Sequence, residues 1–283
     1  MKVVVCVKNN QICDNVMNYG IYVAKILKSQ ISFVAIMENQ ELGDSFYGLA
    51  AGGIVLGEKD MILSNYQNLE QENNEETLKK MQEYLDKCVK KASLEGLKAE
   101  QTLKKGDFID INFIDIISTY KNEADMFITA ARYDESDDID FNANMLIKEL
   151  KVPVLLVNKE FSPIKSVLLA FDGTLSSVKI AGFIHNSPLF SNAKKYIINI
   201  SENEEKSKEA LKIAKDIIGE ENAKYVYING TDAGEEIIKF RRANKLDLIA
   251  TGSFSKNFLK KLIVGSVSQE VITNALVPIL VVA

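Results

Sequence analysis

Tryptophan is absent from this chain of 283 residues, which also holds only one histidine and three cysteines. The lone His185 cannot complete a zinc site or a histidine-based catalytic triad unaided, so we expect it to be structural. The cysteines Cys6, Cys13 and Cys88 do not stand at the spacing of a metal or redox motif. This use of cysteine is typical of a protein kept in a reducing compartment.

Long apolar runs and an excess of positive charge are missing as well. No stretch approaches the ~18 residues that span a bilayer, and the N-terminus is too short and too rich in β-branched residues for a secretory signal. The net charge of -5 and the pI near 5.2 argue against an electrostatic grip on nucleic acid or on an anionic membrane. We therefore expect a cytoplasmic protein that binds neither nucleic acid nor a membrane.

Three apolar blocks occur twice in the chain, in the same order. Residues 2–8 match 166–172, residues 122–129 match 244–251, and residues 151–157 match 276–282. Apolar strands alternate with helical patterns in both copies, which predicts parallel sheets covered on both faces and doubly wound. We expect two tandem, five-stranded α/β domains over residues 1–158 and 164–283, joined by a short linker that contains Pro163.

The first copy contains an insert that the second copy lacks. Residues 38–74 are rich in glycine and follow a strand expected at 31–37, and an amphipathic helix is expected only over 76–94, with Gly96 as its C-cap. A loop of this length is usually functional or mobile. We favour a solvated insert that contains a short helical part over a lid on a ligand.

A phosphate-binding loop is predicted in the second copy alone. Gly252 follows an apolar strand expected at 246–250, and Gly265 with Ser266 begins a helix. Free backbone N–H groups at such a helix start bind anions. The loop also carries three lysines, which we expect to be a solvated face unless the phosphates recruit them; these are Lys256, Lys260 and Lys261.

The spacing of this loop resembles the ATP-binding branch of the universal stress protein family, in its tandem two-domain form. That branch has a glycine, two residues, a second glycine, nine residues, and then Gly-Ser or Gly-Thr. Here Gly252, Ser255, Gly265 and Ser266 stand at those positions, with serine in place of the second glycine. The extra side chain can crowd the phosphates while its hydroxyl can donate to them, so we expect weakened binding.

The resemblance implies further contacts with an adenine nucleotide, ATP or AMP, with Mg²⁺ on the phosphates. Asp172 stands where the family binds the nucleoside, and Ala170 stands where the family often has proline. A backbone contact to adenine falls near Ile200, and Val267 lines the site. The alternative for Asp172 is a role in turning the chain, and the alternative for Ser266 is a helix cap alone.

The first copy departs from this pattern. Its equivalent loop, 130–140, has no glycine and carries five carboxylates against one arginine, which makes a poor cradle for a polyanion. Lys8 stands at the place of Asp172. We expect a solvated acidic loop there in preference to a cation site. The resemblance also implies that the two domains pair through their last strands as a pseudo-dimer, with the fold of the adenine-nucleotide alpha-hydrolase type.

The leading hypothesis is therefore a cytosolic stress or signalling protein that binds ATP or a related adenine nucleotide in the C-terminal domain only. The chain shows no Walker lysine motif and no nucleophile elbow, so we expect no enzyme, although slow ATP hydrolysis is compatible with the loop. The alternative is a nucleotide-free protein-interaction module that meets a protein partner or forms a homodimer. That alternative draws on apolar residues of the insert: Phe46, Tyr47, Ile54, Val55 and Leu56.

Overall fold

The computed structural model describes residues 2–7, 12–38, 56–106, 118–120, 122–131, 146–147, 152–252 and 277–282. Its first half contains β1 (Lys2–Val7), α1 (Cys13–Leu27), β2 (Gln30–Glu38), α3 (Leu56–Leu94), β3 (Ala99–Gly106), β4 (Ala124–Ala130) and β5 (Val154–Val157). Its second half contains β6 (Ser166–Ala170), α6 (Leu175–Asn186), the 3₁₀ turn η1 (Pro188–Phe190), β7 (Lys194–Ile200), α7 (Glu204–Ile218), β8 (Ala223–Ile228), α8 (Ala233–Asn244), β9 (Leu248–Gly252) and β10 (Ile279–Val282).

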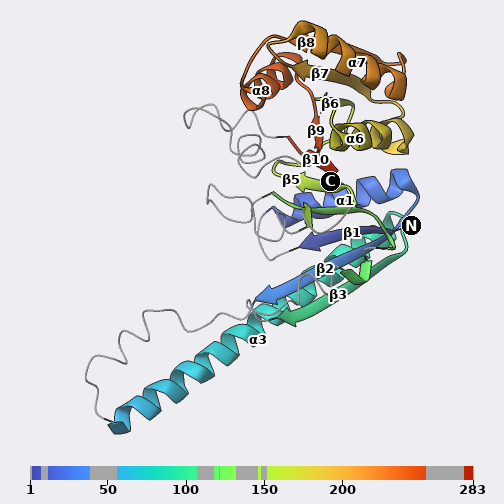
Figure 1. Cartoon of the computed structure of the whole chain (residues 1–283). Coiled ribbons are helices and arrows are strands. Elements are labelled where there is room, and N and C mark those ends of the chain that lie inside the picture. The colour runs from blue at the N-terminus through green and yellow to red at the C-terminus, as the bar shows by residue number, and fades with distance from the viewer. Residues whose placement is uncertain are drawn as a thin grey trace.

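One sheet of ten strands runs through the molecule in the order β3-β2-β1-β4-β5-β10-β9-β6-β7-β8 (Figure 1). Every pair within a half is parallel, whereas β5 and β10 pair antiparallel, with Leu280 opposite Leu155. The two halves therefore repeat one five-strand order on either side of the central pair. This confirms the prediction of two doubly wound units docked as a pseudo-dimer through their last strands, which shields two sheet edges at once.

Successive residues of each strand point to opposite faces of the sheet, and each face has its own layer of helices. Val167 and Leu169 of β6 lie in the cluster that also holds Ile180 of α6 and Ala214 of α7. Leu168 lies in the second cluster, which α8 covers. The chain moves along the sheet in one direction from β6 to β7 and β8, and then returns past β6 to β9. Because each crossover is right-handed, the helices before and after this reversal lie on opposite faces of the sheet.

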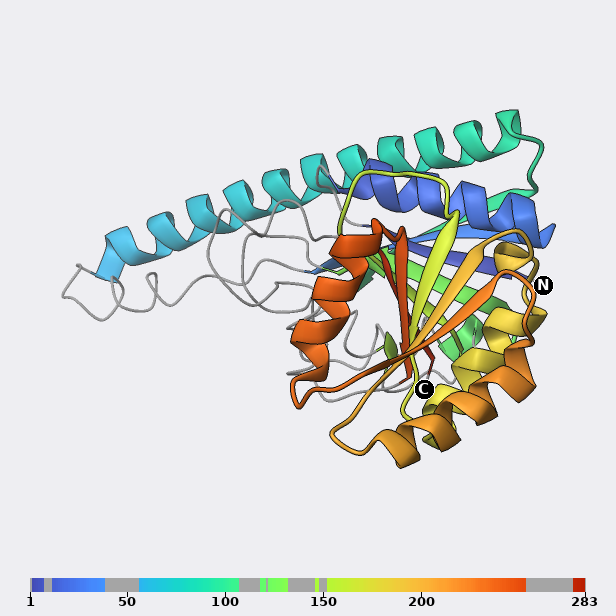
Figure 2. The same cartoon turned by 90° about the horizontal axis from the view of Figure 1, so that it is seen from above.

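Helix α3 begins earlier than the sequence predicted. It starts at Leu56, where a loop to residue 74 was expected, and has 39 residues. Its C-terminal part carries the predicted stripe, with Met81 and Leu85 buried. Its N-terminal part extends beyond the sheet (Figures 1 and 2). The predicted start was wrong because the glycines of the insert were given more weight than the strong helix formers that follow Gly57, which are mainly Glu, Gln, Lys, Leu and Met.

The end of α3 is a Schellman cap, as the position of Gly96 predicted. Gly96 has φ +80°, its N–H donates to the Ser93 carbonyl at 3.0 Å, and the Leu97 N–H donates to the Ala92 carbonyl at 3.0 Å. Despite the length of α3, no helix in the described ranges combines the length and apolarity needed to cross a membrane.

The linker between the halves is packed onto α1. The Phe161 ring lies 5.0 Å from the Tyr19 ring and 5.5 Å from the Tyr22 ring, measured between centroids. The Ser162 N–H donates to the Tyr19 hydroxyl at 3.3 Å, and the Ile164 N–H donates to the Tyr22 hydroxyl at 3.1 Å. These contacts hold the second half against the first helix of the first half.

His185 has the structural role that we expected. Its Nδ1 lies 3.3 Å from the Ile218 carbonyl oxygen, which ties the end of α6 to the end of α7.

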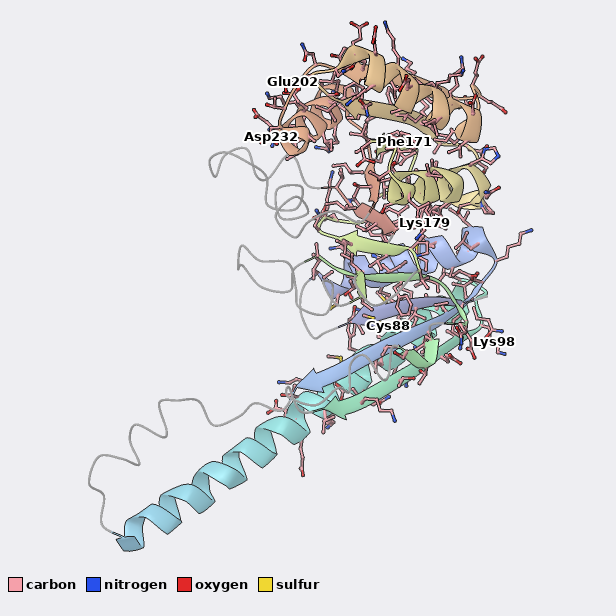
Figure 3. The ribbon with its side chains drawn as sticks, viewed as in Figure 1. Cys88, Lys98, Phe171, Lys179, Glu202 and Asp232 are labelled. Atoms are coloured by element: carbon pink, nitrogen blue, oxygen red, sulfur yellow. The ribbon has the colours of Figure 1, made fainter. Side chains whose placement is uncertain are left out.

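Cys88 is expected to be chemically inert in the folded protein. It is a fully buried residue of α3 (labelled in Figure 3), and burial raises the pKa of its thiol to about 12. Because only the thiolate reacts, labelling by a thiol reagent at pH 8 should be at least ~100-fold slower than in urea-unfolded protein. Mass spectrometry of the peptide that contains Cys88 measures this rate. Fast labelling of a folded sample would contradict the burial of this thiol.

Candidate functional site

The carboxyl ends of β7, β6 and β9 form the predicted site, because these strands are neighbours in the sheet. Ala170, the last residue of β6, pairs with Ile198 of β7 on one side and with Thr251 of β9 on the other. Asp172 and Ile200 each stand two residues beyond this row, and Gly252 stands one residue beyond it. Ligands of doubly wound sheets bind at such strand ends, next to the point where the strand order reverses.

Asp172 turns the chain from β6 into α6. Its Oδ1 accepts hydrogen bonds from the Thr174 N–H at 3.0 Å and from the Thr174 hydroxyl at 2.7 Å. Gly173 between them has φ +80°, which few side chains tolerate. Among the described residues no hydrogen bond reaches Oδ2, and Asp172 is exposed. One carboxylate oxygen therefore shapes the turn, and the second is not used by any hydrogen bond within the described residues.

Gly252 has a structural reason that the sequence did not show. It is the last residue of β9, paired with Val282, and not the first residue of a loop after residue 250. A Cβ at this position would lie 2.6 Å from the Ser176 Cβ and 2.9 Å from the Ser176 carbonyl carbon. Glycine is thus required because the first turn of α6 lies directly on the end of β9.

Ile200 ends β7 with its backbone directed at the space beyond β6. The Lys194 N–H donates to the Lys165 carbonyl, and the Ile198 carbonyl accepts from the Phe171 N–H, so even-numbered residues of β7 face β6. Ile200 belongs to the same series, while the Ser201 N–H donates to the Ile228 carbonyl on the β8 side. The backbone groups of Ile200 therefore point to the space beyond the end of β6, and the contact predicted there remains a prediction.

Ala170 is 5% exposed and points to the face covered by α8. Its methyl group occupies little space beneath the strand ends. Glu202 and Asp232, which follow β7 and β8, lie on the same side of the second half (Figure 3). Asp232 is the N-cap of α8, since its Oδ1 accepts from the Glu235 N–H at 3.1 Å. Asp232 therefore has a structural role, as a helix cap at the edge of the predicted site.

The phosphate side of the predicted site falls outside the described residues. This applies to Ser255, Gly265, Ser266 and Val267, to the three lysines of the loop, and to the helix expected over 266–275. It applies also to Lys8 and to the acidic residues 134–140 of the first half. The contrast between the two loops remains a prediction. Within the described ranges, no group of three or more His, Cys, Asp or Glu side chains could hold a metal ion.

Asn199 was missed by the sequence analysis. Its side chain is 5% exposed, and its Nδ2 donates to the Phe171 carbonyl at 2.7 Å, directly below the Asp172 turn. The signal was an asparagine inside the otherwise apolar run Ile197-Ile198-Asn199-Ile200. A buried amide in such a strand indicates a specific partner.

Comparison with known proteins gives a consistent result. Residues 164–283 match the model of the universal stress protein family. Universal stress protein Slr1230 of Synechocystis sp. is 22% identical over 237 residues, which cover 81% of each chain. A universal stress protein from Archaeoglobus fulgidus superposes with a TM-score of 0.65 at 19% identity, covering 99% of this chain and 95% of that chain. A functionally unknown protein from Pseudomonas aeruginosa gives a TM-score of 0.57 at 15% identity, covering 99% and 92%.

Proposed function

Residues 164–283 belong to the universal stress protein family, and the whole chain is a tandem form of that fold; from this premise we propose a function. The protein binds ATP or a related adenine nucleotide such as AMP, in its second half alone. The nucleotide acts as a regulatory or structural ligand of a cytoplasmic stress or signalling protein.

One observation carries this proposal. Asp172, Ile200 and Gly252 come from segments up to 80 residues apart in the sequence, and the sheet brings them together at the ends of three adjacent strands. The exposed carboxylate suits ribose hydroxyls, and the backbone of Ile200 offers a donor and an acceptor on one side for a base. A nucleoside spans these positions, and its phosphates then extend toward the loop after Gly252.

We assign the phosphates to the loop after Gly252 because of the residues at its end. Gly265 allows close approach to the backbone, and Ser266 supplies a hydroxyl at the helix start. Mg²⁺ would bind to the phosphates themselves, since the nucleotide brings the oxygen ligands that this ion prefers. We propose no catalytic role, because the sequence has no Walker lysine motif, no nucleophile elbow and no evident base beside the phosphate loop.

Calorimetry with ATP and AMP on the full chain tests the proposal. We expect Gly265→Val to weaken ATP binding at least ~30-fold, because a side chain would block hydrogen bonds to a charged group worth about 2 kcal/mol. Gly182→Ala is the matched control, since a methyl group there meets no atom within 4 Å. Equal binding by the Gly265 variant would overturn the assignment of the loop.

A nucleotide-free interaction module is the second candidate, and the geometry of α3 favours it. The N-terminal part of this helix extends beyond the sheet, where a protein partner or a second copy could meet it (Figure 2). Failure of the wild-type chain to bind either ATP or AMP would favour this function over the first.

A further inference from the structure

The hydrogen-bond ladder between β6 and β7 ends one step early. Its regular bonds run from the Lys194 N–H to the Lys165 carbonyl at 3.0 Å and, near the other end, from the Phe171 N–H to the Ile198 carbonyl at 2.9 Å. The next bond of this series would join the Ile200 N–H to the Phe171 carbonyl. Although both residues are described, that bond is not formed, and the pairing stops at Ala170 and Ile198.

The Asn199 side chain takes the acceptor that this bond would use. Its Nδ2 lies 2.7 Å from the Phe171 carbonyl oxygen in a buried environment. Its Oδ1 is also buried and has no hydrogen-bond partner in the part of the chain that the structure describes. A buried amide that is only half satisfied carries a cost in stability, so packing alone does not account for it.

The first half of the chain contains the matching strand pair without the amide. The pairing of Cys6 with Val34 corresponds to that of Ala170 with Ile198, so Ala35 stands at the position of Asn199. There the ladder continues, and Val7 pairs with Ala35. Ala35 cannot donate a side-chain hydrogen bond, and β1 and β2 pair one residue further. Asn199 can donate one, and the ladder between β6 and β7 ends one hydrogen bond earlier.

We propose that Asn199 is a positioning residue for the base of the bound nucleotide. By occupying the Phe171 carbonyl, it leaves the Ile200 N–H without a partner among the described residues at the strand end, beside Asp172. The Ile200 carbonyl points to the same side, so a donor and an acceptor meet the ligand together. Adenine offers the complementary pair, the N1 acceptor and the N6 donor, whereas inosine reverses both. This inference rests on the proposed function and adds the device that selects the base.

Amide hydrogen exchange in the ligand-free chain tests the open ladder without any nucleotide. We expect the Ile200 N–H to exchange at least tenfold faster than the Ile198 N–H in the wild type. In Asn199→Ala, which copies Ala35, the Ile200 N–H should become at least tenfold slower as the ladder closes. Equal protection of the two amides in the wild type would overturn the inference.

Calorimetry then tests the role in binding. The wild type should prefer ATP to inosine triphosphate at least tenfold, and Asn199→Ala should bind ATP at least tenfold more weakly and lose most of this preference. Ser207→Ala removes a different buried polar group, a hydroxyl of α7 that has no partner among the described residues, and should leave both values within twofold. Unchanged ATP affinity and preference in Asn199→Ala would overturn the role of Asn199 and leave the proposed function standing. No binding by the wild type would overturn both.

Discussion

Replacing Gly252 with valine is expected to destabilise the second half by about 3 kcal/mol, near the upper end of the cost of overpacking a buried site. The first atom of the new side chain would lie 2.6 Å from the Ser176 Cβ and 2.9 Å from the Ser176 carbonyl carbon. The second of these is a backbone atom, so the collision cannot be relieved by rotating a side chain. Either β9 or the first turn of α6 has to move.

The same substitution should remove nucleotide binding, because both moving elements carry the site. Asp172 leads into α6, and the phosphate loop leaves from β9. Urea denaturation gives the stability change, and calorimetry with ATP gives the affinity. Gly182→Ala in α6 is again the control, and it should be neutral or stabilising by up to ~1 kcal/mol because alanine favours helix. A Gly252→Val variant of unchanged stability would show that α6 does not lie on β9 as described.

The fold was predictable because each element has a strong local signal. The strands of the second half are short apolar runs between helices with apolar stripes, and their order follows from right-handed crossovers. The antiparallel pairing of β5 and β10 came from the resemblance and not from any residue pattern. The repeat alone predicts two similar units, but it does not say which edges meet.

The first half was less predictable at its insert. The N-terminal part of α3 extends beyond the sheet (Figure 1), so contact with the sheet does not specify where the helix begins. Its helical state rests on the intrinsic preference of its polar residues, which is a weak signal over a short window.

The candidate site was predictable only where glycine or aspartate marks it. The sequence marked Gly252 as the residue at which the chain turns out of the strand. In the structure, glycine is required there because α6 approaches the end of β9 closely. Asn199 acts through a carbonyl 28 residues away in the sequence. Its effect depends on strand register, which no local pattern specifies. Comparison of the two halves of the chain reveals it, since Ala35 occupies the same place in a closed ladder.

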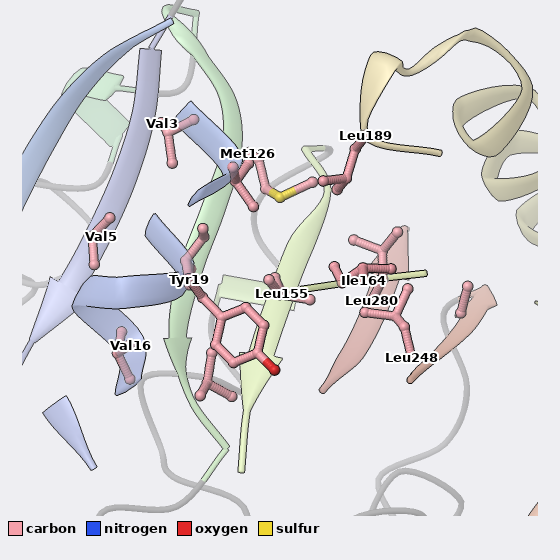
Figure 4. Packing of buried hydrophobic residues seen from close by; sticks show 14 of the residues in the cluster. Val3, Val5, Val16, Tyr19, Met126, Leu155, Ile164, Leu189, Leu248 and Leu280 are labelled. Carbon is pink, nitrogen blue, oxygen red and sulfur yellow. The ribbon is translucent and has the colours of Figure 1, made fainter. Parts of the chain in front are cut away.

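The two halves share one buried hydrophobic cluster, and the second prediction with a large effect concerns a residue of that cluster. Leu280 of β10 lies opposite Leu155 of β5, and both belong to the buried cluster that also holds Tyr19, Ile164 and Leu248 (Figure 4). Leu280 is 0% exposed, and the cluster that contains it reaches from Val3 to Val282. A cavity made here is therefore shared by both halves.

Leu280→Ala should accordingly destabilise the whole chain by about 2–5 kcal/mol, the cost of deleting a buried leucine side chain. Hydrogen exchange followed by mass spectrometry should show lost protection in β1 as well as in β7, because the two halves unfold together when their last strands are paired. Leu94→Ala, at a side chain that is 81% exposed, is the matched control and should change stability by less than ~0.5 kcal/mol. Loss of protection confined to the second half would mean that the halves unfold independently, and that the β5–β10 pairing does not join them into one cooperative unit.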